Sequence, residues 1–180
     1  MSNWNPLNSK IFQYSWVVPN IEAAALIWYE ELGVGPFTVM RKVEVADAVY
    51  RGRGCEAVFS VALAMNGGTQ IELIEQHNDV ASVYRDTIPK GKTANHHVGI
   101  MENEYDNALA YYTQRGYEIG ASGLLGDVRY AYIDTSAVLG HMIEVVEVKE
   151  SIRAIFAAVE QSNKSWDKNR ETLVQEMGSD

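Results

Sequence analysis

The chain contains the same short sequence pattern twice, and this internal repeat constrains its architecture more than any other feature. The first copy opens with Gln13-Tyr-Ser-Trp-Val-Val-Pro-Asn20 and continues into an alanine-rich stretch that ends at Gly33. The second copy opens with His97-Val-Gly-Ile-Met, and its own apolar stretch ends at Gly116. Each copy closes on a segment that carries an acid between apolar neighbours. The repeat therefore sets four potential metal ligands at equivalent positions: Gln13, Glu72, His97 and Glu144.

Each copy is predicted to fold in the order strand, helix, strand, strand, strand. In the first copy Pro19 stops an aromatic and β-branched strand, Asn20 caps a helix, and Gly33 ends it. The strands are expected at 10–18, 37–46, 55–65 and 69–75, and in the second copy at 95–101, 117–121, 127–134 and 141–148. The helix of the second copy is expected at 103–115. The first copy is the longer one, and its excess is assigned to a polar loop around residues 47–54.

These elements predict one α+β domain over residues 1–180. It comprises a first βαβββ module at about 10–75, a second at about 94–148, and a polar C-terminal helix at about 149–176. Apolar positions 152, 155, 156 and 159 recur at helical spacing in the last segment. That helix is expected to lie across the body of the molecule or at a contact between subunits.

Composition excludes several classes of function. A formal charge of −9 argues against a nucleic-acid partner, because phosphates would be repelled. No apolar run is long enough to span a bilayer, and the start of the chain has neither the basic stretch nor the apolar core of a signal peptide, so no membrane partner is expected. The single cysteine, Cys55, permits no internal disulfide, and a cytoplasmic location is expected.

The repeated motifs resemble those of the vicinal oxygen chelate superfamily, which includes glyoxalase I, methylmalonyl-CoA epimerase, extradiol dioxygenases and bleomycin-resistance proteins. The phrase V-V-P-N-I-E-A-A from Val17 onwards resembles the family's V-V-P-D-L-E-A-A. The segments H-H-V-G-I from His96 and I-E-L-I-E from Ile71 resemble the opening of its second module and the closing strand of its first. The resemblance spans about residues 10–148 and implies two modules that curl into a half-barrel around one divalent metal. It also implies a homodimer.

The four potential ligands follow the order found in eukaryotic-type glyoxalase I: Gln13, Glu72, His97 and Glu144. The resemblance therefore implies one divalent ion (zinc, nickel, cobalt or manganese), because an imidazole, an amide oxygen and two carboxylates suit such ions. The residues that grip glutathione in glyoxalase I do not carry over, since Val17 and Gln76 stand at those positions. A glutathione adduct is therefore not the expected substrate.

The resemblance implies proton abstraction next to a carbonyl, with Glu144 as the first candidate base and Glu56 as the second. Candidate contacts to a small organic substrate are Tyr84, Arg85, Tyr130 and Tyr132, each of which is also ordinary in a barrel wall. His96 is expected to point away from its neighbour His97 and to be structural, because successive side chains of a strand face opposite ways.

The leading interpretation is a metal-dependent isomerase, epimerase or lyase. The alternative is a metal-free protein of the same fold that binds a small hydrophobic or aromatic compound, as resistance proteins do. An extradiol dioxygenase is disfavoured, because those enzymes hold iron with two histidines and a glutamate, and only His97 stands at a ligand position here. Methylmalonyl-CoA is a weak candidate substrate, because Lys90 and Lys92 are the only basic cluster for its phosphates.

Overall fold

The computed structural model describes residues 4–177, and within them the strands form one eleven-stranded sheet. The strand order is β11-β2-β5-β6-β1-β7-β10-β9-β8-β3-β4. This arrangement confirms the predicted α+β fold of two βαβββ modules. None of the helices in the described part of the chain is both long and apolar enough to cross a lipid bilayer.

The elements of the modules lie close to their predicted positions. The first module contains β1 (Ile11–Val17), α1 (Ile21–Leu32), β2 (Phe37–Met40), β5 (Phe59–Asn66) and β6 (Thr69–Gln76). The second contains β7 (Ala94–Glu102), α3 (Tyr105–Thr113), β8 (Ile119–Leu125), β9 (Val128–Ile133) and β10 (Met142–Glu147). The remaining elements are η1 (Pro6–Asn8), β3 (Ala46–Tyr50), β4 (Arg53–Gly54), α2 (Val83–Thr87), α4 (Ser136–Leu139), α5 (Glu150–Ser165), η2 (Arg170–Thr172) and β11 (Val174–Glu176).

Local chemistry explains where the first helix begins and ends. The Asn20 side chain accepts a hydrogen bond of 2.8 Å from the amide of Ala23, which satisfies one of the free donors of the first turn. At the other end Gly33 adopts φ 67°, a left-handed conformation that glycine takes without steric cost. Both capping predictions are confirmed.

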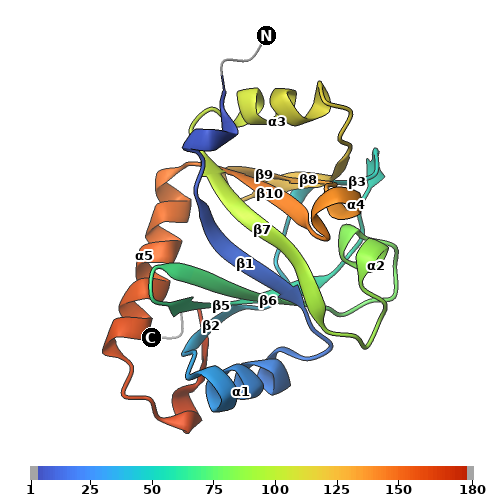
Figure 1. The fold of residues 1–180 in the computed structure, drawn as a ribbon. Coiled ribbons are helices and arrows are strands. Elements are labelled where there is room, and N and C mark those ends of the chain that lie inside the picture. Colours follow the sequence, from blue (N-terminus) through green and yellow to red (C-terminus); the bar gives the residue numbers. More distant parts are fainter. Residues whose placement is uncertain (1–3, 178–180) are drawn as a thin grey trace.

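The two modules join in the middle of the sheet. Within the first, β1 and β6 are parallel neighbours, and within the second, β7 and β10 are their counterparts. Strands β1 and β7 pair antiparallel, so the modules are related by an approximate twofold about this pair. In Figure 1 these two strands cross the centre of the view, with α3 above them and α1 below. Each of these helices covers an apolar cluster on the outer face of its own module.

The predicted loop at 47–54 is wrong, and so is the length of the strand before it. Strand β2 ends at Met40, and residues 46–54 form the β3–β4 hairpin. This hairpin leaves its own module and pairs antiparallel with β8, the edge strand of the second module. An edge strand with free backbone groups gains hydrogen bonds from such a partner, which explains why the excess residues of the first copy are ordered.

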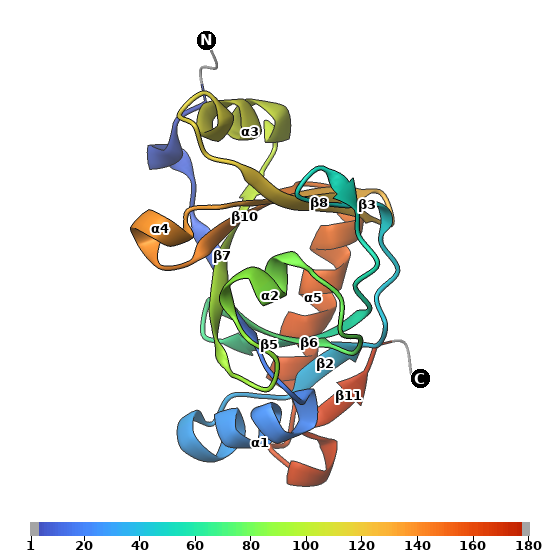
Figure 2. The same ribbon diagram turned by 90° about the vertical axis from the view of Figure 1, so that its right-hand side faces the viewer.

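The C-terminal segment also differs from its prediction. Helix α5 ends at Ser165, whereas a helix to about 176 was expected. The chain then turns through Lys168, at φ 63°, and Val174–Glu176 adds β11 to the free edge of β2. Figure 2 shows α5 running across the molecule between the levels of the two modules. The helix therefore lies across the body of the molecule, as one of the two expected placements has it, and its role in a subunit contact stays a prediction.

Candidate functional site

Four polar side chains from four neighbouring strands converge inside the sheet. Gln13 lies on β1, Glu72 on β6, His97 on β7 and Glu144 on β10. The Nε2 atom of His97 lies 3.3 Å from an oxygen of Glu72 and 3.5 Å from an oxygen of Glu144. It lies 3.4 Å from the amide oxygen of Gln13. The structure therefore brings together all four residues that the sequence placed at equivalent positions.

Gln13 is held with its oxygen toward this centre. Its side-chain nitrogen donates a hydrogen bond of 2.7 Å to the amide oxygen of Gln70 on β6. Because an amide presents its nitrogen and oxygen in opposite directions, the oxygen is left to face His97. Both glutamines are buried, so the pair has no water to replace this bond.

His97 has its ring fixed by a second histidine. His96 is buried, and its Nε2 lies 3.1 Å from the carbonyl oxygen of Val83. A carbonyl can only accept, so that nitrogen donates. Burial, followed by the charge of His97, lowers the pKa of His96 to about 3, so its other nitrogen carries no proton. That nitrogen lies 2.9 Å from Nδ1 of His97, which must donate to it.

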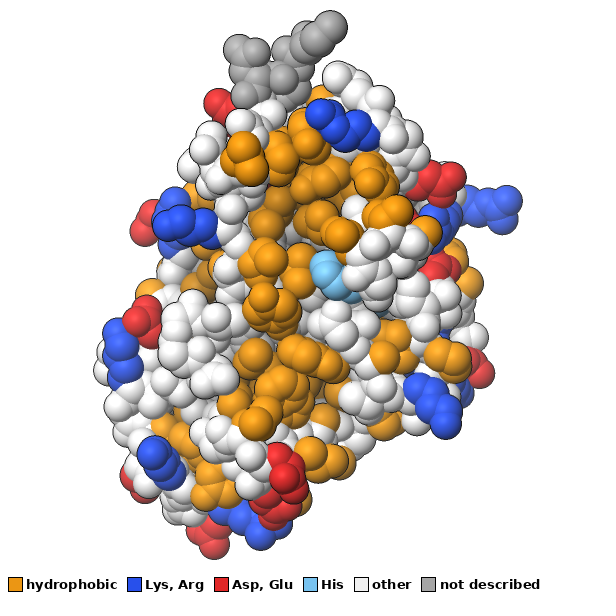
Figure 3. All heavy atoms as spheres, in the orientation of Figure 1, with side chains coloured by type: hydrophobic (Ala, Val, Ile, Leu, Met, Phe, Trp, Pro, Cys, Tyr) orange, Lys and Arg blue, Asp and Glu red, His pale blue; other side chains and the backbone are white. Residues whose placement is uncertain are grey.

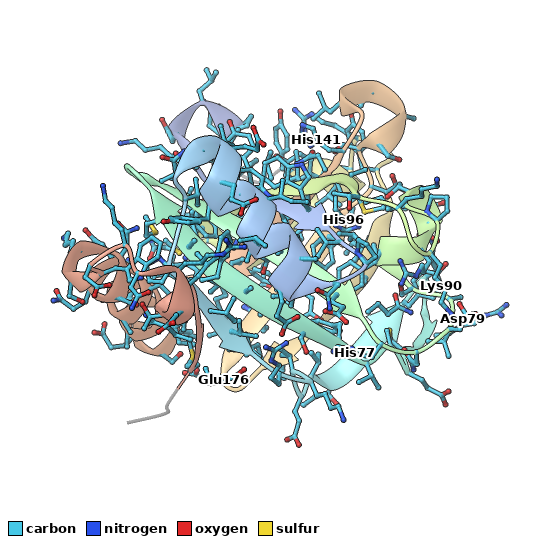
Figure 4. All side chains as sticks on the ribbon, turned by 90° about the horizontal axis from the view of Figure 1, so that it is seen from below. His77, Asp79, Lys90, His96, His141 and Glu176 are labelled. Carbon is cyan, nitrogen blue, oxygen red and sulfur yellow. The ribbon has the colours of Figure 1, made fainter. Side chains whose placement is uncertain are left out.

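The consequence is that the free nitrogen of His97 faces three oxygens. When His97 is neutral, its single proton is on Nδ1 and the lone pair of Nε2 points at Gln13, Glu72 and Glu144. Lone pairs in such proximity require a proton or a cation between them. The residue expected to be structural, His96, is therefore a positioning residue for the site, and the adjacency of two histidines was the signal for it. Figure 4 places His96 among the strands in the middle of the molecule.

Without a cation, a proton fills this role. Burial lowers the pKa of His97, but hydrogen bonds and charges from Glu144 and Glu72 outweigh burial and raise its pKa to about 9. The protonated imidazole then balances part of the charge of the two carboxylates. The buried Glu72 oxygen that lies 3.3 Å from Nε2 makes no hydrogen bond within the described part of the chain, so the protonated imidazole meets it through charge and not through a well-formed hydrogen bond. A buried carboxylate oxygen without a hydrogen bond raises the free energy of the folded state, and a bound metal ion would remove that cost.

The donor set fits a divalent ion in chemistry and in spacing. Two ligands about 2.1 Å from a metal, in tetrahedral or octahedral positions, lie about 3.0 to 3.4 Å apart. The contacts of His97 to the three oxygens are close to that range. Taken without the amide, however, the His, Cys, Asp and Glu side chains of residues 4–177 include no group of three arranged to hold a metal ion. The amide oxygen of Gln13 would be an additional donor beside the three charged or titratable side chains.

Three of the converging side chains, Gln13, Glu72 and Glu144, line one wall of a cavity of about 80 Å³, and the fully buried His97 lies behind them. Most of its walls are apolar and come from both modules, from the segment after β2 and from α5. The apolar wall residues are Phe12, Met40, Val43, Val45, Phe59, Val61, Leu63, Leu125, Val128, Val146, Ile152, Ile155 and Phe156. The part played by α5 was not predicted, because its apolar positions have the same spacing as ordinary packing residues.

Three tyrosines supply the remaining polar groups of the wall. Tyr84, Tyr130 and Tyr132 line the cavity, and the hydroxyls of Tyr84 and Tyr132 are 3.5 Å apart. Tyr132 on β9 is the register partner of Glu144 on the neighbouring strand β10. Burial raises the pKa of all three phenols, so they remain protonated donors. The structure thus brings three of the four predicted substrate contacts to one cavity.

Glu56 and Arg85 are not brought to this cavity. Glu56 is exposed in the loop before β5, and only its backbone oxygen is engaged there, by Asn78. Arg85 lies on α2, and its guanidinium reaches 3.5 Å from the carbonyl oxygen of Gln76. Neither residue lines the cavity. Spacing along the chain did not reveal this, because the β3–β4 hairpin takes the segment before Glu56 out of its module.

The family is established by comparison with known proteins. Residues 12–132 match the model of the Glyoxalase/Bleomycin resistance protein/Dioxygenase superfamily, so the chain belongs to this superfamily. This match confirms the resemblance inferred from the repeated motifs. No match is found among curated proteins.

Solved structures with the same fold include several epimerases. A hypothetical protein from Bacillus halodurans C-125 is 17% identical, with a TM-score of 0.56, and the match covers 79% of this chain and 96% of that one. Streptomyces coelicolor methylmalonyl-CoA epimerase, in complex with 2-nitronate-propionyl-CoA, is 15% identical, with a TM-score of 0.57 and the same coverage. The methylmalonyl-CoA epimerase of Mycobacterium tuberculosis is 14% identical, with a TM-score of 0.54, over 80% of this chain and 91% of that one. At such identities the likeness concerns the fold.

Proposed function

We propose that the protein is a metal-dependent isomerase, epimerase or lyase that removes a proton next to a carbonyl of a small organic substrate. The observation that carries this proposal is the convergence of three oxygens, from Gln13, Glu72 and Glu144, on the free nitrogen of His97 at the wall of an apolar cavity. Epimerases among the proteins of the same fold support this class of reaction.

Gln13, Glu72, His97 and Glu144 would hold one divalent ion, with zinc, nickel, cobalt and manganese as the candidates. Such an ion polarises a carbonyl oxygen and acidifies the adjacent C–H bond. Two observations favour a cation here: the buried Glu72 oxygen makes no hydrogen bond within the described part of the chain, and the lone pair of neutral His97 faces it. An extradiol dioxygenase remains the less favoured reading, because His97 is the one histidine whose nitrogen faces the three oxygens.

Glu144 is the proposed base. Its side chain is mostly buried, but it lines the cavity, so it reaches both the centre and a bound ligand. Its carboxylate takes the proton from the substrate carbon, and the electron pair of the C–H bond moves toward the carbonyl oxygen. Returning the proton to the other carbon completes isomerisation, and returning it to the other face completes epimerisation. Glu72 is the other carboxylate of the cavity wall and replaces Glu56 as the candidate second base.

The tyrosine hydroxyls have a separate task. Because their pKa values are raised, Tyr84, Tyr130 and Tyr132 donate hydrogen bonds and do not act as bases. A donor directed at an oxygen on which negative charge develops stabilises the transition state more than the ground state. Tyr132, opposite Glu144 in the sheet, is the best placed of the three.

Solvent deuterium uptake tests the proposed chemistry. Protein loaded in turn with each candidate ion is incubated with a panel of ketones and hydroxyketones in D₂O, and loss of the α-proton is followed by NMR. We expect uptake with the wild type, a fall of at least about a hundredfold in Glu144→Gln, and no change in Glu56→Gln. Uptake that is equal in Glu144→Gln and the wild type would contradict the role of Glu144.

A metal-free binding protein is the second candidate. It is favoured by the mainly apolar cavity and by the lack, among the described residues, of three acidic, histidine or cysteine side chains arranged for a metal. The two candidates differ in metal content. The enzyme would bind about one metal ion per chain, whereas the binding protein would bind no metal in a fixed ratio to the chain.

A homodimer stays a prediction. Hydrophobic side chains form a band down the face that Figure 3 displays, over the central strands. The large hydrophobic residues that are exposed in the described part of the chain include Ile11 and Tyr14 on β1, and Val138 and Leu139 on α4. An apolar band of this kind is a candidate subunit contact, and light scattering would give the mass in solution.

A further inference from the structure

A second cavity of about 70 Å³ adjoins the first. Six residues line both cavities and form the wall between them: Val43, Val45, Phe59, Tyr84, Tyr130 and Tyr132. The second cavity is further lined by small residues, among them Cys55, Ala57 and Ser122.

Neither cavity has a positive charge on its wall. Apart from the tyrosines and Cys55, the only ionisable side chains that line either cavity are Glu72 and Glu144, both in the first one. A divalent ion would balance these two carboxylates, so that the site as a whole would offer an anion no net positive charge. An anionic substrate would therefore lose its hydration without gaining an ionic partner.

Lys90 and Lys92, the basic pair considered for the phosphates of a CoA substrate, line neither cavity. Lys90 lies in an exposed loop, where its ammonium group is 3.1 Å from a carboxylate oxygen of Asp79. Lys92 is exposed in the same loop. Figure 4 shows Lys90 and Asp79 at the edge of the molecule, away from His96 in its middle. The net charge of −9 further opposes a ligand that carries several phosphates.

We propose that the substrate is an uncharged carbonyl compound with an apolar tail, and that the tail occupies the second cavity while the carbonyl lies at the four converging side chains. This inference rests on the proposed function. It separates the protein from relatives of the same fold whose structures contain acyl-CoA compounds, such as the Streptomyces epimerase with 2-nitronate-propionyl-CoA.

Cys55 provides a reporter for the second cavity. It is the only cysteine of the chain, it is half-buried, and it lines the second cavity but not the first. A ligand tail in the second cavity should therefore slow alkylation of Cys55 by iodoacetamide, which mass spectrometry follows on the intact protein. This readout requires no turnover.

The ligands form a matched pair of the same shape: 4-phenyl-2-butanone, which is neutral, and 3-phenylpropanoate, which is anionic. At equal concentration we expect the ketone to slow alkylation of Cys55 at least about fivefold and to bind at least about tenfold more tightly by ligand-observed NMR. The acid and propionyl-CoA should do neither. Equal or stronger binding of the acid would overturn the inference, and so would binding of the ketone without protection of Cys55.

A cavity-filling variant gives an independent arm that does not depend on thiol reactivity. Ser122→Leu should weaken binding of 4-phenyl-2-butanone and leave the shorter 2-butanone unaffected, whereas Ser165→Leu, at an exposed position on α5, should change neither. Equal loss of both ketones in Ser122→Leu would overturn the placement of the tail. A ketone that binds as expected but shows no deuterium uptake with any ion would refute the proposed function and leave the ligand class intact.

Discussion

Ser15 on β1 and Gly99 on β7 occupy equivalent places in the sheet, and each is paired with two of the four residues of the site. Ser15 lies opposite Glu72 of its own module and opposite His97 of the other. Gly99 lies opposite Glu144 of its own module and opposite Gln13 of the other. The twofold relation of the modules therefore holds at the level of single residues. Small side chains at both places leave the space in which four large ones meet.

The first prediction concerns this space. A β-carbon on Gly99 would lie 2.9 Å from the Phe12 ring and 3.0 Å from the amide oxygen of Gln13. Gly99→Ala should therefore displace that oxygen and lower metal affinity about tenfold or more, as loss of supporting groups does at other centres. Gly68→Ala is the matched control, because a β-carbon there meets nothing within 4 Å. Isothermal titration with zinc measures both, and unchanged affinity in Gly99→Ala would remove Gln13 from the ligand set.

The second prediction concerns the stability of the metal-free protein as pH changes. Although burial opposes it, the carboxylates raise the pKa of His97 to about 9, against about 6.5 when unfolded. A group whose pKa is higher in the folded than in the unfolded protein stabilises the folded state fully at pH values below its unfolded pKa. That stabilisation is lost as the pH rises through its folded pKa. In chelator, the free energy of unfolding should thus fall by on the order of 3 kcal/mol between about pH 6.5 and 9.

Urea unfolding at several pH values within this window measures the effect. His97→Gln should flatten the dependence, since the titrating group is gone, and a saturating divalent ion should flatten it as well. A free energy of unfolding that rises across the window in the wild type would contradict the coupling of His97 to Glu72 and Glu144.

The third prediction concerns His96. His96→Phe removes the acceptor for Nδ1 of His97 and the donor to Val83 while keeping a ring of similar volume. We expect metal affinity to fall about 10- to 100-fold, with a fold preserved by circular dichroism. His141→Gln is the control, because the His141 ring bonds to the carbonyl of its neighbour Met142 and does not line the cavity. Similar affinity in the two variants would show that His96 has no positioning role.

The fourth prediction concerns the hairpin that crosses between the modules. Arg51, at its turn, bonds to Asp86 on α2 and to Asp134 after β9, at 2.8 and 2.5 Å. These charges are partly screened, so Arg51→Met should cost about 1 to 2 kcal/mol in urea unfolding and speed amide exchange in residues 46–54. Lys164→Met, which breaks an exposed pair with Glu160 on α5, should cost less than about 0.5 kcal/mol. Equal costs would mean that the Arg51 network does not anchor the hairpin.

The internal repeat was sufficient to predict the modules, their order and the four converging residues. The twofold relation of the sheet brings equivalent residues of a duplicated unit together. The proximity of Gln13 and His97 could therefore be predicted from the repeat without information on tertiary contacts. The caps at Asn20 and Gly33 are local and were predicted from residue type. In these cases the interaction that fixes the structure is encoded within a short segment or within the repeat itself.

The features that were missed depend on contacts between distant segments. The β3–β4 hairpin is ordered by pairing with β8 and by the ion pairs of Arg51, neither of which its own sequence reveals. Residues 174–176 form a strand because β2 offers a free edge. His96 was expected to face away from the site, but the rings of successive residues can still meet at their edges, and here their nitrogens are 2.9 Å apart.

Metal content per chain tests the central claim most directly. Protein purified without tag or chelator is measured by plasma mass spectrometry, as isolated and after incubation with zinc, nickel, cobalt and manganese. The account predicts about one ion per chain in the wild type and in the Glu56→Gln control, and loss of most of it in His97→Ala and Glu72→Ala. An absence of bound metal under all these conditions, or full retention in both alanine variants, would contradict a metal centre at these four residues.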